Sequence, residues 1–285
     1  MNLARTRRWA PVAALALSLC VIAGLSRMAL HKPEPAFVAP PQPSPTVPVI
    51  AKTTPAPKVA QPASKNLATI TYTFVPGGFP ADPAPADTAA LTEGLHPARK
   101  LPLYDAPGGK PRAFLPPEIR GVPVTVPIVD REPGWVAVLV PSVNRRIGWL
   151  PAGGWVSRPL RDQLILRRDR HELAWLHDGV RRESWTVTTG SSQTPTPLGR
   201  TFVLGRTGTH GEVYAGLDAL VLGAVPDDRE AVAPGLRDAH TGIHSWYRAS
   251  AFGRSISNGC IRVPKDGQRA LLASLAPGTP VVVVA

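Results

Sequence analysis

Residues 239–263 read AHTGIHSWYRASAFGRSISNGCIRV, and this stretch decides how the whole chain is interpreted. It contains Cys260, the only cysteine beyond the N-terminal segment, directly after a glycine. A lone cysteine is more often an inert core residue than a reactive one. Here, however, Gly259 lets the backbone approach a ligand, and the backbone N–H groups beside the thiol can hold an oxyanion. We therefore interpret Cys260 as a candidate nucleophile.

A thiol nucleophile needs a base, and histidine is the usual one. His240 and His244 both precede the cysteine and share strand parity, so periodicity alone leaves the choice between them open. Arg262 shares a strand face with Cys260, because side chains two residues apart on a strand point the same way. Its charge can favour the thiolate or bind a substrate carboxylate.

Strand and turn signals surround this stretch. Residues 163–190 read QLILRRDRHELAWLHDGVRRESWTVTTG, which predicts three strands with a hairpin turn at His-Asp-Gly 177–179. The valines near residue 285 predict a terminal strand. Between two prolines, KDGQRALLASLA (265–276) predicts one helix with Asp266 as its N-cap. Residues 159–285 are thus predicted to be mainly β with a late helix.

These motifs resemble the catalytic domain of bacterial L,D-transpeptidases, the cysteine enzymes of the peptidoglycan wall. The family signature is a histidine, a gap, and then Ser/Thr-His-Gly-Cys. Gly-Ile-His244-Ser245 matches the first part, and Ser257-Asn258-Gly259-Cys260-Ile-Arg262 matches the second. TPTPLGRTFVL (194–204) and GTPVVVV (278–284) also fit.

The resemblance implies an L,D-transpeptidase-type β-sandwich and an acyltransferase. No metal or other cofactor is implied, because no set of His, Cys and Asp residues in the sequence has ligand spacing. The donor would be a tetrapeptide stem with a diamino acid in third place, followed by D-alanine. An amine of a neighbouring stem would then complete a 3→3 cross-link. The implied catalytic residues are Cys260 as nucleophile, His244 as base and Ser245 as the residue whose carbonyl orients that base. The implied oxyanion and substrate-binding residues are Ser257, Asn258, Gly259 and Arg262.

The sequence departs from the family pattern in two places. Asn258 stands where the family usually has a second histidine, and the gap between His244 and Ser257 is slightly short. Asparagine can donate a hydrogen bond but cannot titrate at neutral pH, so we expect activity to survive. Three alternatives stay open: an L,D-carboxypeptidase, an enzyme that attaches proteins to peptidoglycan, and a non-catalytic cell-wall binding protein.

Residues 89–158 predict a small all-β domain that precedes the catalytic one. Its strand-like runs are divided by Pro-Gly and Gly-Gly turns, and it resembles bacterial SH3-like domains in LPLYDAPGG, REPGWVAVLV and NRRIGWLP. Trp135, Trp149 and Trp155 either line a ligand groove or fill a small barrel. We expect at least two of the three to be core residues.

The N-terminus predicts export. Residues 1–30 combine arginines with the uncharged run WAPVAALALSLCVIAGL (9–25), the pattern of a signal peptide or signal-anchor helix. The lack of a clear Ala-x-Ala site favours an uncleaved anchor, and Leu19 argues against a lipoprotein site at Cys20. Residues 31–88 predict a Pro-rich disordered linker, with ten prolines between Pro33 and Lys65. We expect an extracytoplasmic protein of the cell envelope, membrane-anchored or secreted.

Composition limits the remaining classes. The 285 residues include 34 prolines and two cysteines, with a net charge of +12. Two cysteines are too few for a disulfide scaffold, and one apolar run is too few for a multi-pass membrane protein. The basic balance suits an anionic envelope surface, and no nucleic-acid motif appears. We expect a monomer whose partners are peptidoglycan stem peptides, without nucleic acid, and the membrane if the N-terminal segment is uncleaved.

Overall fold

The computed structural model of the chain describes residues 56–285. The predicted signal segment and the first part of the linker lie outside the described residues. Within the described part, the prediction of a mainly β protein with a late helix is confirmed. Among these residues, no helix combines the length and apolar character needed to cross a bilayer.

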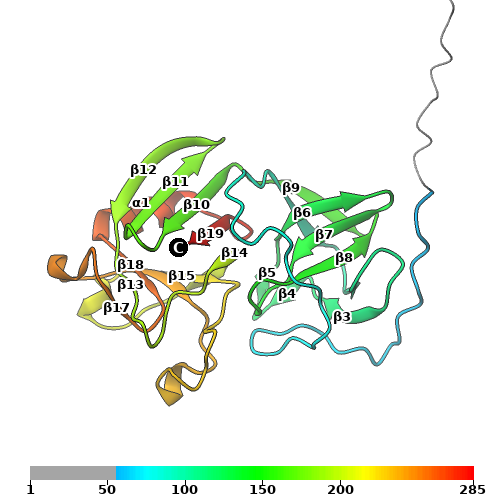
Figure 1. Cartoon of the computed structure of the whole chain (residues 1–285), viewed down its shortest axis with the longest axis horizontal. Coiled ribbons are helices and arrows are strands. Elements are labelled where there is room, and N and C mark those ends of the chain that lie inside the picture. The colour runs from blue at the N-terminus through cyan, green and yellow to red at the C-terminus, as the bar shows by residue number, and fades with distance from the viewer. Residues whose placement is uncertain (1–55) are drawn as a thin grey trace, which may run out of the picture. The chain divides into compact units, whose positions relative to one another are not determined.

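The first sheet is wholly antiparallel and has the strand order β3-β2-β8-β7-β6-β1-β9. Figure 1 labels β3, β6, β7, β8 and β9 of this sheet. The residues between β3 and β6 form a separate two-stranded hairpin. The strands of the sheet are β1 (Glu93–Pro97), β2 (Leu101–Tyr104), β3 (Pro111–Leu115), β6 (Val126–Glu132), β7 (Trp135–Leu139), β8 (Ile147–Pro151) and β9 (Trp155–Pro159). Those of the hairpin are β4 (Glu118–Ile119) and β5 (Val122–Pro123).

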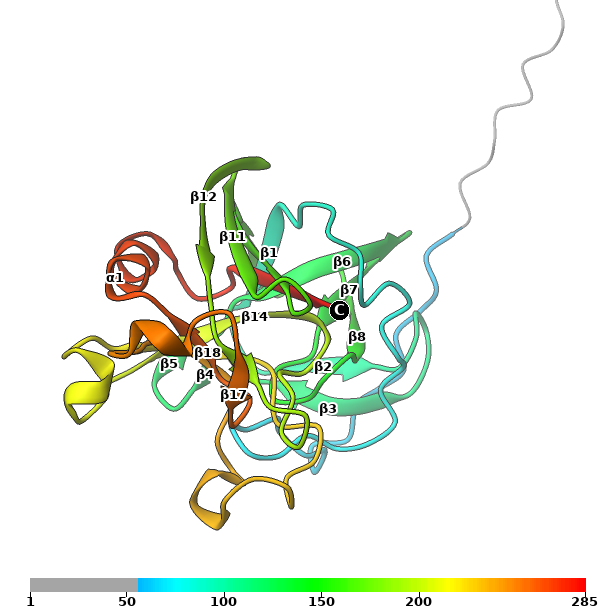
Figure 2. The ribbon, with the colours of Figure 1, turned by 60° about the vertical axis from the view of Figure 1, so that its left-hand side comes forward.

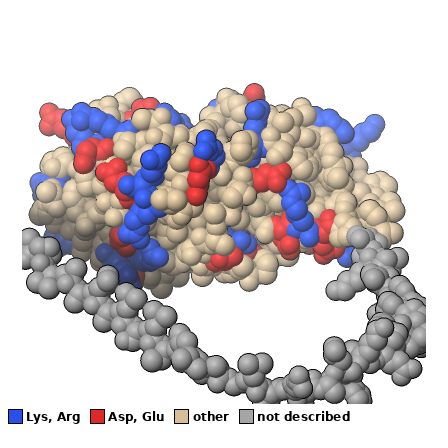
Figure 3. All heavy atoms as spheres, turned by 90° about the horizontal axis from the view of Figure 1, so that it is seen from above, with Lys and Arg blue, Asp and Glu red and all other residues tan. Residues whose placement is uncertain are grey.

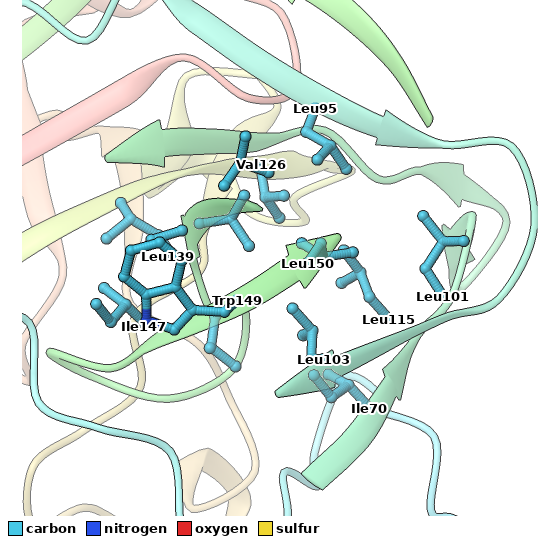
Figure 4. Close-up of a cluster of buried hydrophobic side chains, with 14 of the residues drawn as sticks. Ile70, Leu95, Leu101, Leu103, Leu115, Val126, Leu139, Ile147, Trp149 and Leu150 are labelled. Atoms are coloured by element: carbon cyan, nitrogen blue, oxygen red, sulfur yellow. The ribbon is translucent and has the colours of Figure 1, made fainter. Parts of the chain in front are cut away.

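The apolar side chains of this sheet close on one core, which Figure 4 shows in part. Leu103, Leu115 and Leu150 are completely buried there. Trp135 and Trp149 are buried and Trp155 is half-buried against them, so the expectation that at least two tryptophans fill the core is confirmed. The SH3-like identity of this sheet stays a prediction.

The structure corrects the predicted linker in its second half. Ile70 and Phe79 are 1% and 5% exposed in the first core, and the indole N–H of Trp135 donates to the Lys58 carbonyl at 2.8 Å. Large apolar side chains at these positions give residues 58–88 enough buried surface to stay packed. The disorder predicted over 31–88 is therefore wrong for residues 58–88.

The second sheet has the order β12-β11-β10-β19-β14-β15-β16-β18. Figure 2 shows β11 and β12 extending beyond the rest of it. Its strands are β10 (Asp162–Arg167), β11 (Glu172–His177), β12 (Val180–Thr186), β14 (Gly199–Thr207), β15 (Ala219–Leu222), β16 (Gly242–Ser245), β18 (Ile261–Val263) and β19 (Pro280–Val284). The short strands β13 (Thr189–Gly190) and β17 (Ser255–Ser257) form a separate parallel pair. Three 3-10 helices cover Glu212–Tyr214, Pro234–Leu236 and Ala249–Ala251.

Three local predictions for this sheet can be compared with the structure. The hairpin turn is confirmed: Asp178 and Gly179 both have positive φ, as a two-residue turn between β11 and β12 requires. The terminal strand is confirmed as β19. The helix is confirmed as α1 (Lys265–Ser274), but its N-cap is Pro264, so Asp266 lies within the first turn. There its charge still faces the positive end of the helix dipole.

The charged surface is mixed. On the face shown in Figure 3, basic and acidic side chains are interspersed. The positive balance of the sequence is therefore not gathered into one patch on that face.

Candidate active site

The register between the parallel strands β16 and β18 sets the geometry of the site. His244 pairs with Arg262, which places Gly242 opposite Cys260. The isoleucines that separate these residues on both strands are completely buried in the second core. Because side chains alternate along a strand, the other four residues share the opposite face of the sheet. The two candidate catalytic side chains, Cys260 and His244, are thus diagonal neighbours on one face.

Cys260 is a free thiol that remains partly accessible. A Cβ at position 242 would lie 3.8 Å from its sulfur, so glycine leaves the thiol room. Burial raises the pKa of the Cys260 thiol above its ordinary value, and the hydrogen bond from the Gly242 N–H and the charge of Arg262 oppose this less strongly. The thiol is consequently protonated near neutral pH, and its attack on a carbonyl requires a base.

His244 is 8% exposed, and its ring is fixed on two sides. Its Nδ1 donates to the Ser245 carbonyl at 2.8 Å, which leaves the Nε2 of the neutral ring as a proton acceptor. The Tyr214 and Trp246 rings lie edge-on to it at 5.0 and 5.9 Å. Burial lowers the pKa of His244, which keeps the ring neutral and able to accept a proton. The Ser245 hydroxyl donates to the Tyr214 carbonyl.

His240 lies two residues before β16, and both of its ring nitrogens face backbone carbonyls. Its Nδ1 faces the Leu222 carbonyl at 2.5 Å and its Nε2 faces the Tyr72 carbonyl at 2.7 Å. Its ring also stacks on Tyr72 at 4.0 Å. Neither nitrogen is free to take a proton from a thiol. These contacts, which sequence parity could not reveal, favour His244 as the base.

The turn before Cys260 is closed by a serine. The Ser257 hydroxyl donates to the Cys260 carbonyl at 2.6 Å and accepts from the Gly259 N–H at 3.2 Å. Gly259 has φ +104, a conformation that side chains rarely allow. Asn258, between them, is exposed. In this arrangement Ser257 supports the turn, while the Asn258 side chain is exposed and takes no part in that support.

Two threonines that the sequence reasoning missed hold this turn from the other side. Thr196 donates to the Gly259 carbonyl at 2.9 Å, and Thr194 donates to the Ser257 carbonyl at 3.1 Å. Both lie in the 194–204 stretch, which was noted only for its resemblance to the family. Their spacing with intervening prolines was the available signal, because such a segment cannot join a ladder and its hydroxyls are free to bond elsewhere.

Arg262 lies in β18, two residues after Cys260, and its side chain shares the face of the thiol. Its guanidinium lies 3.7 Å over the Trp246 ring, and its Nε is buried with no hydrogen-bond partner among the described residues. Trp246 and Tyr214 were also missed at sequence level. Trp246 directly follows the His-Ser pair and had a local signal, whereas Tyr214 reaches the site from a distant 3-10 helix and had none.

Within residues 56–285, no group of three or more His, Cys, Asp or Glu side chains is arranged to bind a metal ion. The chemistry available to the described residues is a thiol, a neutral imidazole fixed in one tautomer, backbone N–H groups at a glycine turn, and one guanidinium. This set suits acyl transfer through a thioester.

Comparison with known proteins agrees with this chemistry. Residues 161–283 match the YkuD family, described as the L,D-transpeptidase catalytic domain. No curated protein matches the chain.

Solved structures also resemble the chain, more distantly. An L,D-transpeptidase from Mycobacterium smegmatis is 15% identical, with a TM-score of 0.35, over 53% of this chain and 90% of that one. L,D-transpeptidase 3 from Mycobacterium tuberculosis, solved with a faropenem-derived adduct, is 15% identical with a TM-score of 0.36 over the same shares. An Enterococcus faecium L,D-transpeptidase is 20% identical with a TM-score of 0.33, over 44% of this chain and 50% of that one. Because these TM-scores are below 0.5, the assignment depends on the family match: residues 161–283 belong to the L,D-transpeptidase catalytic domain family.

Proposed function

We propose that the chain is a cysteine-dependent L,D-transpeptidase that forms 3→3 cross-links in peptidoglycan through a thioester on Cys260. The observation that carries the proposal is the pairing of β16 with β18. It places the free thiol on the same sheet face as His244, whose Nδ1–H is held by the Ser245 carbonyl at 2.8 Å.

In the first half-reaction, His244 Nε2 takes the proton of the Cys260 thiol as the sulfur attacks the carbonyl of the third stem residue. The C–S bond forms and the carbonyl oxygen becomes an oxyanion. When the intermediate collapses, the C–N bond to D-alanine breaks and His244 returns the proton to the leaving amine. The product is a thioester and free D-alanine.

In the second half-reaction, the side-chain amine of another stem attacks the thioester. His244 takes a proton from this amine, the C–S bond breaks, and the proton passes to the departing thiolate. A new amide joins the third residues of the two stems, and the free Cys260 thiol is restored.

The backbone N–H groups of Gly259 and Cys260 are the proposed oxyanion donors. The Gly259 N–H bonds to the Ser257 hydroxyl at 3.2 Å in the resting protein, a long bond. A charged oxygen is a stronger acceptor than a hydroxyl, so the intermediate competes for this donor. We assign Asn258 and Arg262 to substrate binding, the first by amide hydrogen bonds and the second by its charge.

The decisive experiment is acylation of the purified chain by a carbapenem, followed by intact-protein mass spectrometry. One adduct is expected on the wild type and on Cys20→Ala, the variant at the other cysteine, and none on Cys260→Ala. His244→Ala should slow acylation by about 10³-fold, whereas His240→Ala should not. An adduct on Cys260→Ala, or loss of acylation in His240→Ala alone, would contradict the assigned roles.

The acceptor is tested by incubating the chain with a disaccharide-tetrapeptide and analysing the products by mass spectrometry. A 3→3 dimer supports the transpeptidase. Continued release of D-alanine without dimer indicates transfer to water, and a single equivalent of D-alanine with a stable thioester on the chain indicates a protein amine as acceptor. If the stem binds the chain but neither acylates Cys260 nor loses D-alanine, the non-catalytic binding protein is supported instead.

We also propose that residues 1–30 direct export or anchor the chain, and that the following residues tether it. Because residues 58–88 pack on the folded part, the tether shortens to residues 31–57. Mapping the N-terminus of the mature protein tests whether the anchor is retained.

A further inference from the structure

Four adjacent strands carry one continuous row of residues across the catalytic face. Gly205 of β14 pairs with Val221 of β15, Val221 pairs with Gly242 of β16, and Gly242 lies opposite Cys260. Residues directly opposite in neighbouring strands point to the same side of a sheet. The row therefore begins at the proposed nucleophile and crosses three inter-strand spacings to Gly205.

This row carries few side-chain atoms between the thiol and Val122, and its two glycines are buried. Two of its members are glycines, and Val221 is only half-buried. Val122 lies against the Gly205 end of the row, because a Cβ added at position 205 would lie 3.2 Å from a methyl carbon of Val122. A substrate lying over the row would therefore meet small residues beneath it and a wall at Gly205.

A cavity of about 230 Å³ lies at that end. Gly205, Val221 and Thr207 line it from the catalytic sheet, and Tyr72, Arg120 and Val122 line it from the part of the chain that precedes the family match. Tyr72 is fixed by His240, which stacks on its ring and meets its carbonyl. The side of the cavity that Tyr72 lines is thus held by His240 against the segment that leads into β16.

Two cations border the cavity, Arg120 and Arg206, and neither forms an ion pair with a carboxylate of residues 56–285. The Arg120 guanidinium lies 4.0 Å from the centroid of the Tyr72 ring. The Arg206 guanidinium donates to the Leu275 carbonyl instead. Arg120 is the group that can bind an anion there.

The backbone at Arg120 supports a role in binding. Arg120 and Gly121 form the two-residue turn between β4 and β5, and Arg120 has φ +52. Such a turn favours asparagine, aspartate or glycine at this position, so arginine is held there at a conformational cost. That cost places a guanidinium at the edge of the cavity.

We propose that this cavity binds the C-terminal carboxylate of the acceptor stem peptide, with Arg120 as its counter-ion. The inference rests on the proposed function of Cys260. Three inter-strand spacings correspond to about 14 Å, or roughly four residues of extended peptide. The terminal carboxylate of the donor lies one residue from the carbonyl under attack and cannot reach so far. In the acceptor, the diamino side chain and the D-alanine together separate the attacking amine from the carboxylate by a comparable length.

The test uses the full chain with a fixed donor tetrapeptide and two acceptors, one with a free C-terminal carboxylate and one with a C-terminal amide. We expect Arg120→Gln to raise the KM for the free acid about tenfold, with D-alanine release from the donor unchanged. The wild type should show a similar rise for the amide, and Arg120→Gln should no longer distinguish acid from amide. Arg120→Lys should recover part of the affinity, whereas Arg182→Gln, an exposed control on β12, should behave as wild type.

Two results overturn the inference while leaving the proposed function intact. One is normal acylation with an unchanged KM for both acceptors in Arg120→Gln. The other is a raised KM for the donor with no change for the acceptor, which would assign the cavity to the donor stem. Absence of acylation in the wild type would instead defeat the proposed function. The comparison of acid with amide in the wild type needs no variant, so the inference stays testable if Arg120→Gln fails to fold.

Discussion

Asp82 and Arg200 are 118 residues apart in the sequence, and their side chains form an ion pair that is 0% and 5% exposed. The guanidinium meets both carboxylate oxygens, with the Nε to Oδ2 distance at 2.8 Å. Asp82 belongs to the segment that precedes the first sheet, and Arg200 is the second residue of β14. The pair therefore fixes this segment against the catalytic sheet.

Asp82→Asn is expected to lower the free energy of unfolding by about 3–5 kcal/mol, because it leaves a buried guanidinium without its charge partner. Urea denaturation monitored by tryptophan fluorescence measures this. The control is Asp169→Asn, whose side chain is 62% exposed and whose loss should cost less than about 0.5 kcal/mol. Equal effects of the two substitutions would show that burial adds nothing to the Asp82–Arg200 pair.

Gly242→Ala is expected to slow carbapenem acylation roughly tenfold to hundredfold while leaving the chain folded. The added Cβ would lie 3.3 Å from the Leu220 carbonyl, which is closer than an ordinary contact, so β16 must shift at the residue opposite Cys260; its distance of 3.8 Å from the Cys260 sulfur is an ordinary contact. Stopped-flow acylation and the unfolding midpoint are the measurements. Gly208→Ala, where an added Cβ meets no atom within 4 Å, is the matched control and should match the wild type in both.

Thiol alkylation and acylation are expected to depend differently on pH. Burial raises the pKa of Cys260 above its ordinary 9.0, so iodoacetamide, which reacts with the thiolate, should modify the free enzyme appreciably only in alkaline solution. Acylation uses neutral His244 as base, and burial lowers the pKa of His244 below its ordinary 6.5. The acylation rate should therefore rise with pH, with a midpoint below pH 6.5, and stay constant at higher pH where the His244 ring is neutral. A shared inflection in both profiles would indicate a thiolate–imidazolium pair instead.

Stability is expected to fall on acidification, and His240 is one cause. Burial lowers the pKa of His240 below 6.5 in the folded protein. Below pH 6.5 the unfolded chain therefore binds a proton that the folded chain does not, and stability is lost as the pH falls toward the folded pKa. His240→Gln should reduce the loss between pH 7.5 and 5.5 in urea denaturation without abolishing it, because the pKa of His244 is lowered too. The exposed variant His210→Gln should leave the loss unchanged; a steeper loss in His240→Gln would contradict the sign.

Local sequence signals were sufficient to predict the strands, the late helix and the motif around Cys260. The hairpin turn at Asp178 and Gly179 depends on two adjacent residues, and the mainly β character depends on short-range alternation. The N-cap of α1 was missed because Asp266 is a better capping residue than Pro264, yet the Pro264 carbonyl already accepts the first helical bond from Gln268.

Contacts between distant segments could not be read from the sequence. The choice between His240 and His244 depends on the Tyr72 carbonyl, 168 residues from His240. The packing of residues 58–88 depends on a core formed by later strands, and a Pro-rich composition gave no sign of it. The register that aligns Gly205 with Cys260 passes through four strands, each set by its own neighbour.

Strand β19 has a consequence for the order in which the catalytic domain can form. It lies between β10 and β14, pairing in parallel with the first and antiparallel with the second, although it follows both in the chain. Until residues 280–284 have been synthesised, the ladder of the main sheet is interrupted between β10 and β14, and only the short contact of Thr188 with Arg262 and the pairing of β13 with β17 join the two parts. A nascent chain that already contains Cys260 and His244 therefore still lacks a finished sheet, so translation itself delays the appearance of a reactive cysteine.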